Sequence, residues 1–461
     1  MKNTSQPAET RSLSASTEPG IGTALRQTTP SRSHSNTRRS LTTTSCHRGV
    51  TPPTCHPVLM AELLPFRALR PSAERIGSTI APPYDVMGLE EVRRWRESDL
   101  GNITHVDLAL PEDGEQPYVE LARRLETWIA SGRLLRDKEP TLTIHRMTFT
   151  DALGVERTIS GVLGALEVTD GDGSTVLAHE RTTPKASTDR YDLTVATATN
   201  LSPVWGLALG AGLTELLAEP GSNPLYARMN DSAAGLVDHR WEVVDEPRRI
   251  TAIRETVAQD DVLIADGHHR YGVARRVLED HSSRLPGATH TLAFISDLTE
   301  DQLSVAAIHR VYSGVPADEL RAALIGGYRP TTGGTLTAAS DAANLPSQIA
   351  ERDQPCLIAP GGNIEWLEAR PEPLDGVRDL DGARLEHLLA AVAHEVDYLH
   401  DPVEAAELVL AGRRSAAVLI RPVGIAEITR TGRTGELMPP KSTFFSPKLP
   451  TGAVLRPLDG R

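Results

Sequence analysis

The sequence predicts a mixed α/β fold (α+β), in which helices and strands alternate, preceded by a disordered N-terminal tail. Helical and strand periodicities alternate along the chain from Met60 onward, as they do where helices pack on a sheet. The chain has 461 residues, 39% of them hydrophobic, which is enough for two or three domains with buried cores. Residues 1–59 differ from the rest in composition.

Residues 1–59 are expected to lie outside the fold. They contain 21 Ser or Thr residues, no Phe, Trp or Tyr, and only Glu9 and Glu18 as acids, a composition that cannot bury a core. Their Arg and Ser content is also found in transit peptides, but no amphipathic apolar period accompanies it. We interpret the segment as a disordered tail, or as an over-long gene reading in which translation starts at Met60.

A main α/β domain that carries the site is expected over residues 60–330. Apolar residues three and four apart predict its helices, and short apolar or alternating runs between turn residues predict its strands. In chain order, the expected elements are a helix over 119–130, strands over 142–149 and 159–168, a helix over 250–258, a strand over 262–265 and a helix over 271–280.

Residues 331–461 are expected to form a C-terminal α/β part that completes the fold. Leu and Val residues at helical spacing predict one long helix over 383–399, and a helix over 403–410 leads into a strand over 416–420. The Gly- and Ala-rich stretch 333–344 is expected to be the least ordered internal region, and it marks a soft boundary.

The motif expected to carry function is Asp266-Gly267-His268-His269-Arg270. It joins a buried strand to a helix, where free backbone N–H groups and the helix dipole favour an anion. Arg270, expected to be exposed in the first turn, adds a planar fork for phosphate or carboxylate, and the histidines add donors or a titrating base. In the alternative interpretation, Asp266 only caps the helix and its neighbours are solvated.

Three other polar segments are candidates for the same site. We expect the loop residues His179, Glu180, Asp189 and Arg190 to share a cleft with the turn, because dense polar loops tend to converge on a site. The proline-stiffened turn before Asp85 and the lysine- and hydroxyl-rich segment 438–448 are the others. Solvated loops, structural turns or a docked terminus would look much the same.

Composition argues against several function classes. A net charge of -13 disfavours nucleic acid as a partner, and three cysteines permit neither a disulfide framework nor a cysteine metal site. No apolar run approaches the roughly 18 residues of a membrane span, so a soluble, cytoplasmic protein is expected. No phosphate-binding P-loop pattern occurs. A metal held by His179, Glu180, His268 and His269 stays an open alternative.

Taken in order, these motifs resemble the bacterial and archaeal family called domain of unknown function 1015. The resemblance spans about residues 64–458. It rests on the residues Pro82-Pro83-Tyr84-Asp85-Val86, His179-Glu180 with Thr182, Lys185 and Asp189-Arg190, Ala265 to Tyr271, Ile308-His309-Arg310, and Met438 to Thr443 with Pro447-Lys448.

The turn itself resembles the phosphate-holding box of the ParB/sulfiredoxin-like superfamily, which includes free-serine kinases. That resemblance implies a ParB/sulfiredoxin-like core with additional α/β elements, and phosphates gripped by residues 267–270. Sulfiredoxin chemistry is not expected, because its cysteine is replaced here by His268 and His269.

The residues and the resemblance together lead to one functional hypothesis. It is a nucleotide-dependent, kinase-like phosphotransferase that uses ATP or ADP with Mg²⁺ and a small hydroxylated substrate. The expected nucleotide contacts are Asp266, Gly267, His268, His269, Arg270, Lys185, Arg190 and Lys441, and the catalytic candidates are Glu180, Asp85 and His268.

Two alternatives from other classes stay open. The first is a metal-dependent hydrolase that uses His179, His268 and His269. The second is a non-catalytic module that binds a nucleotide or metabolite.

Overall fold

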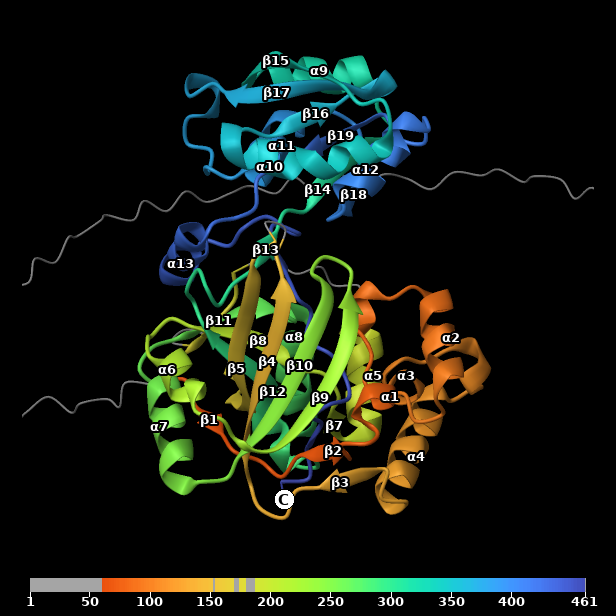
Figure 1. Cartoon of the computed structure of the whole chain (residues 1–461), viewed down its shortest axis with the longest axis vertical. Coiled ribbons are helices and arrows are strands. Elements are labelled where there is room, and N and C mark those ends of the chain that lie inside the picture. Colours follow the sequence, from red (N-terminus) through yellow and green to blue (C-terminus); the bar gives the residue numbers. More distant parts are fainter. Residues whose placement is uncertain (1–59, 152–153, 170–173, 180–186, 461) are drawn as a thin grey trace, which may run out of the picture. The chain divides into compact units, whose positions relative to one another are not determined.

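The computed structural model describes residues 60–151, 154–169, 174–179 and 187–460. It confirms the mixed α/β class, with a nine-stranded sheet and a six-stranded sheet among these residues (Figure 1). The predicted elements 119–130, 250–258, 262–265 and 403–410 are all present, with ends that shift by up to three residues.

The nine-stranded sheet has the order β6-β11-β8-β12-β5-β4-β10-β9, and β1 also pairs with β5. The predicted strands 142–149 and 159–168 form one antiparallel hairpin of this sheet, in which Thr143 lies opposite Leu163. Its strands are β1 (Leu63–Leu64), β4 (Leu142–Thr150), β5 (Glu156–Glu167), β6 (Val176–Leu177), β8 (Val204–Ala208), β9 (Ser222–Asp231), β10 (Gly235–Val244), β11 (Val262–Asp266) and β12 (His290–Asp297).

Apolar side chains are buried on both faces of this sheet, which explains why residues 262–265 are continuously apolar. Leu263 and Ala265 belong to one core cluster with Trp205 and Phe294. Val262 and Ile264 belong to the cluster that also contains side chains of α6 (Leu213–Ala218) and α7 (Pro247–Val257). The remaining helices of this part are α1 (Ile76–Thr79), α2 (Leu89–Ser98), α3 (Thr104–Asp107), α4 (Pro117–Ala130), α5 (Ser187–Thr197) and α8 (His268–His281).

The six-stranded sheet has the order β15-β17-β16-β19-β14-β18. Its strands are β14 (His309–Ser313), β15 (Tyr328–Thr335), β16 (Cys356–Ile358), β17 (Asn363–Ala369), β18 (Glu395–Leu399) and β19 (Ala416–Leu419), and the helices in this stretch of chain are α9 (Ala317–Ile325), α10 (Leu345–Arg352), α11 (Asp381–Leu389), α12 (Pro402–Leu410) and α13 (Ile425–Thr434). Short strand pairs complete the description, namely β2 (Leu69–Pro71) with β3 (Leu134–Arg136), β7 (Thr199–Asn200) with β21 (Arg456–Pro457), and β13 (Val305–Ala306) with β20 (Phe444–Phe445).

The long helix predicted over 383–399 is wrong. Helix α11 ends at Leu389, and Glu395–Leu399 instead form β18, which pairs antiparallel with β14. Val396 and Leu399 have the spacing of a helix, but the backbone hydrogen bonds that β14 offers favour a strand at these residues. The stretch 333–344, expected to be the least ordered, contains the end of β15 and a 3₁₀ helix at Ala339–Asn344.

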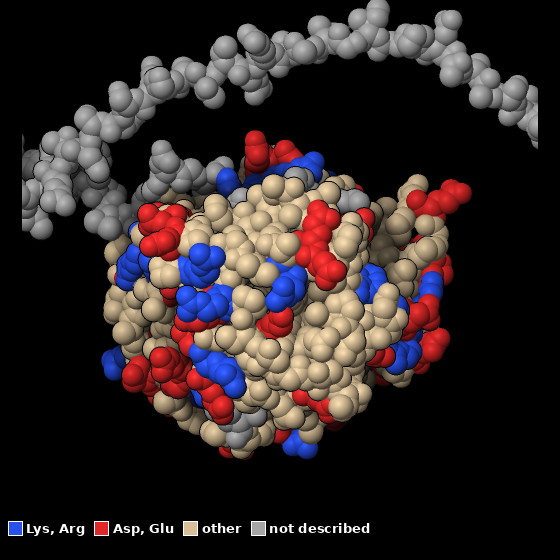
Figure 2. Space-filling view, turned by 90° about the horizontal axis from the view of Figure 1, so that it is seen from above, with Lys and Arg blue, Asp and Glu red and all other residues tan. Residues whose placement is uncertain are grey.

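Charged side chains of both signs are interspersed on the face shown in Figure 2, which carries no broad basic field. Over the described ranges, no helix combines the length and the apolar character that crossing a bilayer demands.

Gly161 in β5 tests the packing of the nine-stranded sheet. A Cβ there would overlap the Phe294 ring and lie 2.6 Å from the Ile295 carbonyl oxygen, so Gly161→Ala should destabilise the protein by about 1–3 kcal/mol. Gly272→Ala, at an exposed site in α8 with no atom within 4 Å of the added carbon, should be neutral or stabilising by up to about 1 kcal/mol. Urea unfolding of the two variants gives both values; equal midpoints would contradict this packing.

Candidate functional site

The turn lies between the carboxyl end of β11 and the N-terminus of α8. Gly267 occupies the N-cap position with φ of 88°, in the left-handed region that favours glycine. A Cβ on Gly267 would also lie 2.9 Å from Nε of Arg270. The position therefore requires glycine for its backbone angle and for the close approach of the Arg270 guanidinium.

Asp266 is the central carboxylate of the site. Its Oδ1 accepts a hydrogen bond from Lys448 Nζ at 2.9 Å, and its Oδ2 accepts one from Arg270 Nη2 at 2.6 Å. Burial opposes ionisation, but the charges of Lys448 and Arg270 outweigh it and hold the pKa of Asp266 far below its ordinary value. Gly267, and not Asp266, occupies the N-cap position of α8, and the Asp266 carboxylate accepts from Arg270 and Lys448, so the alternative in which Asp266 caps the helix is wrong.

Arg270 is buried, with 8% of its surface exposed, which contradicts the expectation of an exposed first-turn side chain. Its guanidinium donates to the Pro203 carbonyl and to Asp266, and Asp85 lies 3.9 Å from Nη2. The spacing of four residues in the chain lets Arg270 fold back onto Asp266, so one donor on Nη1 and one on Nη2 serve the fold. Its buried Nε has no hydrogen-bond partner among the described residues.

A second buried ion pair lies beside the first. Arg190 is 5% exposed; its Nη1 donates to Asp107 Oδ1 at 2.9 Å and its Nε donates to Asp189 Oδ2 at 2.9 Å. The guanidinium also covers the ring of Tyr84 at 4.2 Å from the centroid. Burial raises the pKa of the Tyr84 phenol to about 12, so Tyr84 keeps its proton at neutral pH.

The two arginines face one small cavity of about 40 Å³, which Asp107 also lines. Arg190 therefore lies in the same place as the turn, as the sequence predicted, and Asp189 follows as its ion-pair partner.

His179 also lies against the turn, as predicted. Its ring centroid is 4.6 Å from that of His268. Its Nδ1 donates to the Ile264 carbonyl, which leaves Nε2 to accept from the Thr443 hydroxyl at 2.8 Å. Burial lowers the pKa of His179 to about 4. Burial also lowers the pKa of His268 to about 3, and the electrostatic effect of nearby His179 is the second cause. Both imidazoles are therefore neutral at pH 7.

His268 differs from His179 in its hydrogen bonding. Among the described residues, its buried Nε2 has no hydrogen-bond partner. A neutral imidazole nitrogen in this state can accept from, or donate to, a ligand group placed beside it.

His269, Asp85 and Lys441 form the more open side of the site. His269 is partly buried, and burial followed by the charge of Lys441 lowers its pKa, whereas Asp85 acts in the opposite direction. Lys441 and Asp85 are exposed. Lys441 and Asp85 thus act electrostatically on His269, and Asp85 also lies 3.9 Å from Arg270 Nη2.

Two predicted residues, Glu180 and Lys185, lie outside the described residues. Conversely, the predicted segment 438–448 includes Thr443 and Lys448 without giving either a role in the site, and Asp107 was not predicted at all. The role of Lys448 could have been predicted, because this residue ends one of the motifs on which the family resemblance rests. Nothing in the sequence around Asp107 indicates a functional residue.

Over the described ranges, no group of three or more His, Cys, Asp or Glu side chains is arranged to hold a metal ion.

A family model described as protein of unknown function (DUF1015) matches residues 63–397. No curated protein matches the chain. Among solved structures, a free serine kinase mutant in complex with AMP superposes with a TM-score of 0.35 at 14% identity, covering 62% of this chain and 88% of that chain.

Two further structures give similar values. A conserved hypothetical protein from Pyrococcus furiosus has a TM-score of 0.34 at 14% identity, covering 62% of this chain and 94% of its own. C-terminally truncated SbnI from Staphylococcus aureus has 0.34 at 12% identity, covering 63% and 85%. Scores below 0.5 transfer neither fold nor activity to this chain.

Replacing Asp266 tests whether its charge holds the site together. Asp266→Asn leaves the buried Lys448 and Arg270 without their anion and should destabilise the protein by about 3 kcal/mol at pH 7. The pKa of Asp266 is lowered in the fold. The difference should therefore be complete above the ordinary value of about 4 and shrink as the pH falls through the lowered pKa. Urea unfolding against pH measures it.

Asp85→Asn is the matched control. Asp85 is exposed and 3.9 Å from Arg270, so its replacement should change stability by no more than about 0.5 kcal/mol. Equal losses in both variants would show that Asp266 has no special structural role.

Proposed function

Since this chain belongs to the DUF1015 family of proteins of unknown function, we propose that it is a nucleotide-dependent phosphotransferase acting on a small hydroxylated molecule. The nucleotide phosphates bind at the N-terminus of α8, within the turn 266–270. The substrate hydroxyl approaches from the open side formed by Asp85, His269 and Lys441.

The observation that carries the proposal is that α8 begins without a side-chain cap, directly after a turn held by the ion pairs of Asp266. The first bond within α8 runs from the Tyr271 N–H to the Gly267 carbonyl at 2.9 Å. The N–H groups of His268, His269 and Arg270 precede it, and no side chain among the described residues caps the helix. Such N–H groups and the positive end of the helix dipole bind phosphate well.

Burial changes the role of Arg270 from the one expected of an exposed side chain. Arg270 and Lys448 hold the turn through their ion pairs with Asp266. While they stay in these pairs, their positive charges still favour an anion at the start of α8. The direct phosphate contacts are then the backbone N–H groups, with His269 and the exposed Lys441 at the mouth. Arg190 is similarly committed to Asp107 and supports the site from behind.

In the proposed reaction, the substrate hydroxyl oxygen attacks the terminal phosphorus of ATP. A new P–O bond forms, the bond to the bridging oxygen breaks, and ADP leaves with that electron pair. Asp85 orients the hydroxyl and takes its proton, a role that suits an exposed carboxylate at the rim of the turn. Neutral His268 offers Nε2 as a further hydrogen-bonding group.

Few carboxylate oxygens of the site are left to bind Mg²⁺. Both oxygens of Asp266 are occupied by Lys448 and Arg270. The exposed carboxylate of Asp85 and the buried Oδ2 of Asp107, which has no hydrogen-bond partner among the described residues, are the carboxylate oxygens nearest the turn that could meet the ion. Mg²⁺ commonly uses one or two carboxylates together with phosphate oxygens and water. When bound, it would neutralise phosphate charge.

The hydrolase alternative is less well supported. His179 uses both ring nitrogens, one on the Ile264 carbonyl and one on the Thr443 hydroxyl. It therefore has no free lone pair for a metal ion. A binding module without turnover stays as the alternative that assays of ADP formation would separate from a kinase.

Lys441→Ala tests the proposed nucleotide site without disturbing the buried ion pairs. Loss of a charged hydrogen-bond donor at the mouth should weaken ATP binding by about 1.5 kcal/mol, or roughly tenfold. The melting temperature should change little, because Lys441 is exposed. Titration calorimetry with ATP, with and without Mg²⁺, measures the affinity.

Lys138→Ala, which removes an exposed lysine after β3, is the control and should bind ATP as the unaltered protein does. If the unaltered protein binds no nucleotide under either condition, the phosphotransferase proposal fails. If Lys441→Ala binds equally well, Lys441 does not contact the phosphates.

A further inference from the structure

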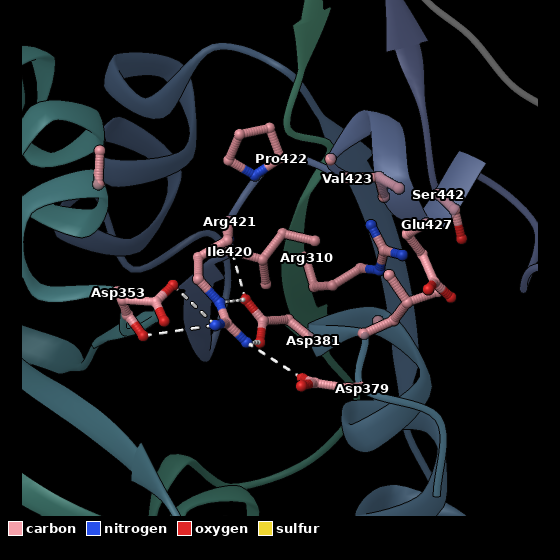
Figure 3. Close-up of a pocket in the computed structure, with 14 residues that line it drawn as sticks. Arg310, Asp353, Asp379, Asp381, Ile420, Arg421, Pro422, Val423, Glu427 and Ser442 are labelled. Atoms are coloured by element: carbon pink, nitrogen blue, oxygen red, sulfur yellow. Dashed lines mark hydrogen bonds and ion pairs between the residues drawn. The ribbon is translucent and has the colours of Figure 1, made fainter. Parts of the chain in front are cut away.

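A second cavity, of about 360 Å³, lies among α10, α11, α13 and the ends of β14 and β19 (Figure 3). Its wall includes Arg310, Ala350, Gly382, Gly424 and Ser442. A volume above 300 Å³ is in the range of sites for small organic ligands. None of the residues of the turn 266–270 lines it.

The carboxylates that line this cavity are each held by an arginine. Figure 3 shows Arg421 enclosed by three of them on one side of the cavity. The shortest pairs are Asp381 with Arg421 at 2.6 Å, Asp353 with Arg421 at 2.9 Å, Asp379 with Arg384 at 2.8 Å, and Glu427 with Arg430 at 3.0 Å and with Arg378. The charges of Asp381 and Glu427 are thus offset by arginines within the wall. Those of Asp353 and Asp379, whose side chains are 82% and 78% exposed, are screened by solvent.

Arg310 extends into the other side of the cavity, toward Glu427 and Ser442 (Figure 3). It is 4% exposed, its Nη1 donates to the Ile308 carbonyl, and its guanidinium lies over the Tyr398 ring at 4.8 Å. A Cβ at Gly382 would be 2.9 Å from Nη2. Glycine therefore permits the guanidinium to lie against the first turn of α11.

Two helices also begin at the cavity wall. The N-cap residues of α11 and α13 are Leu380 and Gly424; both line the cavity, and neither helix has a side-chain cap among the described residues. Their first-turn N–H groups add to the positive potential around Arg310. A buried guanidinium and two helix N-termini thus lie at the wall of one cavity.

We propose that this cavity binds a small organic molecule through an oxyanion group, a carboxylate or a phosphate, with Arg310 as the anchoring side chain. The planar guanidinium matches both groups with paired hydrogen bonds. The proposal stands apart from phosphotransfer at α8, because it concerns a different cavity and a different arginine.

One loop joins the two places. Ser442 lines this cavity, whereas its neighbour Lys441 acts electrostatically on His269 and its neighbour Thr443 donates to His179. A ligand beside Ser442 therefore lies against the same segment that closes the turn.

Filling the cavity from Gly424 tests the proposal. Gly424 has φ of -78° and ψ of 159°, and no atom lies within 4 Å of an added Cβ, so Gly424→Leu should fold and occupy the cavity. Gly88→Leu is a matched control, since Gly88 is also an N-cap residue with φ of -80°, ψ of 161° and open space around it.

The probes are inorganic phosphate and succinate, titrated separately by calorimetry in the absence of nucleotide. The unaltered protein should bind at least one of them, Gly88→Leu should stay within about twofold, and Gly424→Leu should bind at least about tenfold more weakly. If only phosphate or only succinate binds, that probe identifies the oxyanion that the cavity prefers. As a second variant, Ala350→Glu places a negative charge at an exposed position of the wall and should weaken binding in the same direction.

Two results would overturn the proposal. One is that neither probe binds the unaltered protein. The other is that binding survives in Gly424→Leu and Ala350→Glu but is lost in Lys441→Ala, which would put the anion at the turn of α8.

Discussion

The carboxylate of Asp266 connects a strand, the helix that follows it and the C-terminal segment of the chain. It ends strand β11, it accepts from Arg270 in the first turn of α8, and it accepts from Lys448 near the C-terminus. Buried cations of this kind are stable only beside an anion. This side chain therefore holds the end of the C-terminal segment 438–448 through Lys448. The pairing of β20 with β13, and the hydrogen bond from the Lys448 backbone N–H to Asp231, hold the same segment at other points.

This arrangement divides the polar residues of the site into two groups. Arg270, Lys448 and Arg190 are buried and ion-paired, so they fix the geometry of the turn. The backbone N–H groups at the start of α8 and the side chains at the open rim are those left to meet a ligand. A phosphate site of this form relies on a fixed backbone and on background charge more than on a mobile arginine.

Local patterns in the sequence were sufficient for the turn but not for its environment. The apolar run 262–265 and the following glycine predicted the strand, the turn and the helix, because neighbouring residues determine all three. Burial of Arg270 was not predictable, since its guanidinium is covered by parts of the chain far from the turn and donates to the Pro203 carbonyl, 67 residues away. The wrong helix over 383–399 has the same origin: β14, far back in the chain, supplies the hydrogen bonds that turn Glu395–Leu399 into a strand.

A crystal structure of the protein with ADP and Mg²⁺ tests the central claim most directly. The account predicts phosphate oxygens about 3 Å from the backbone nitrogens of His268, His269 and Arg270, with the pairs of Asp266 to Lys448 and Arg270 unbroken. A nucleotide bound elsewhere, or a phosphate that displaces Asp266 from Arg270, would contradict it.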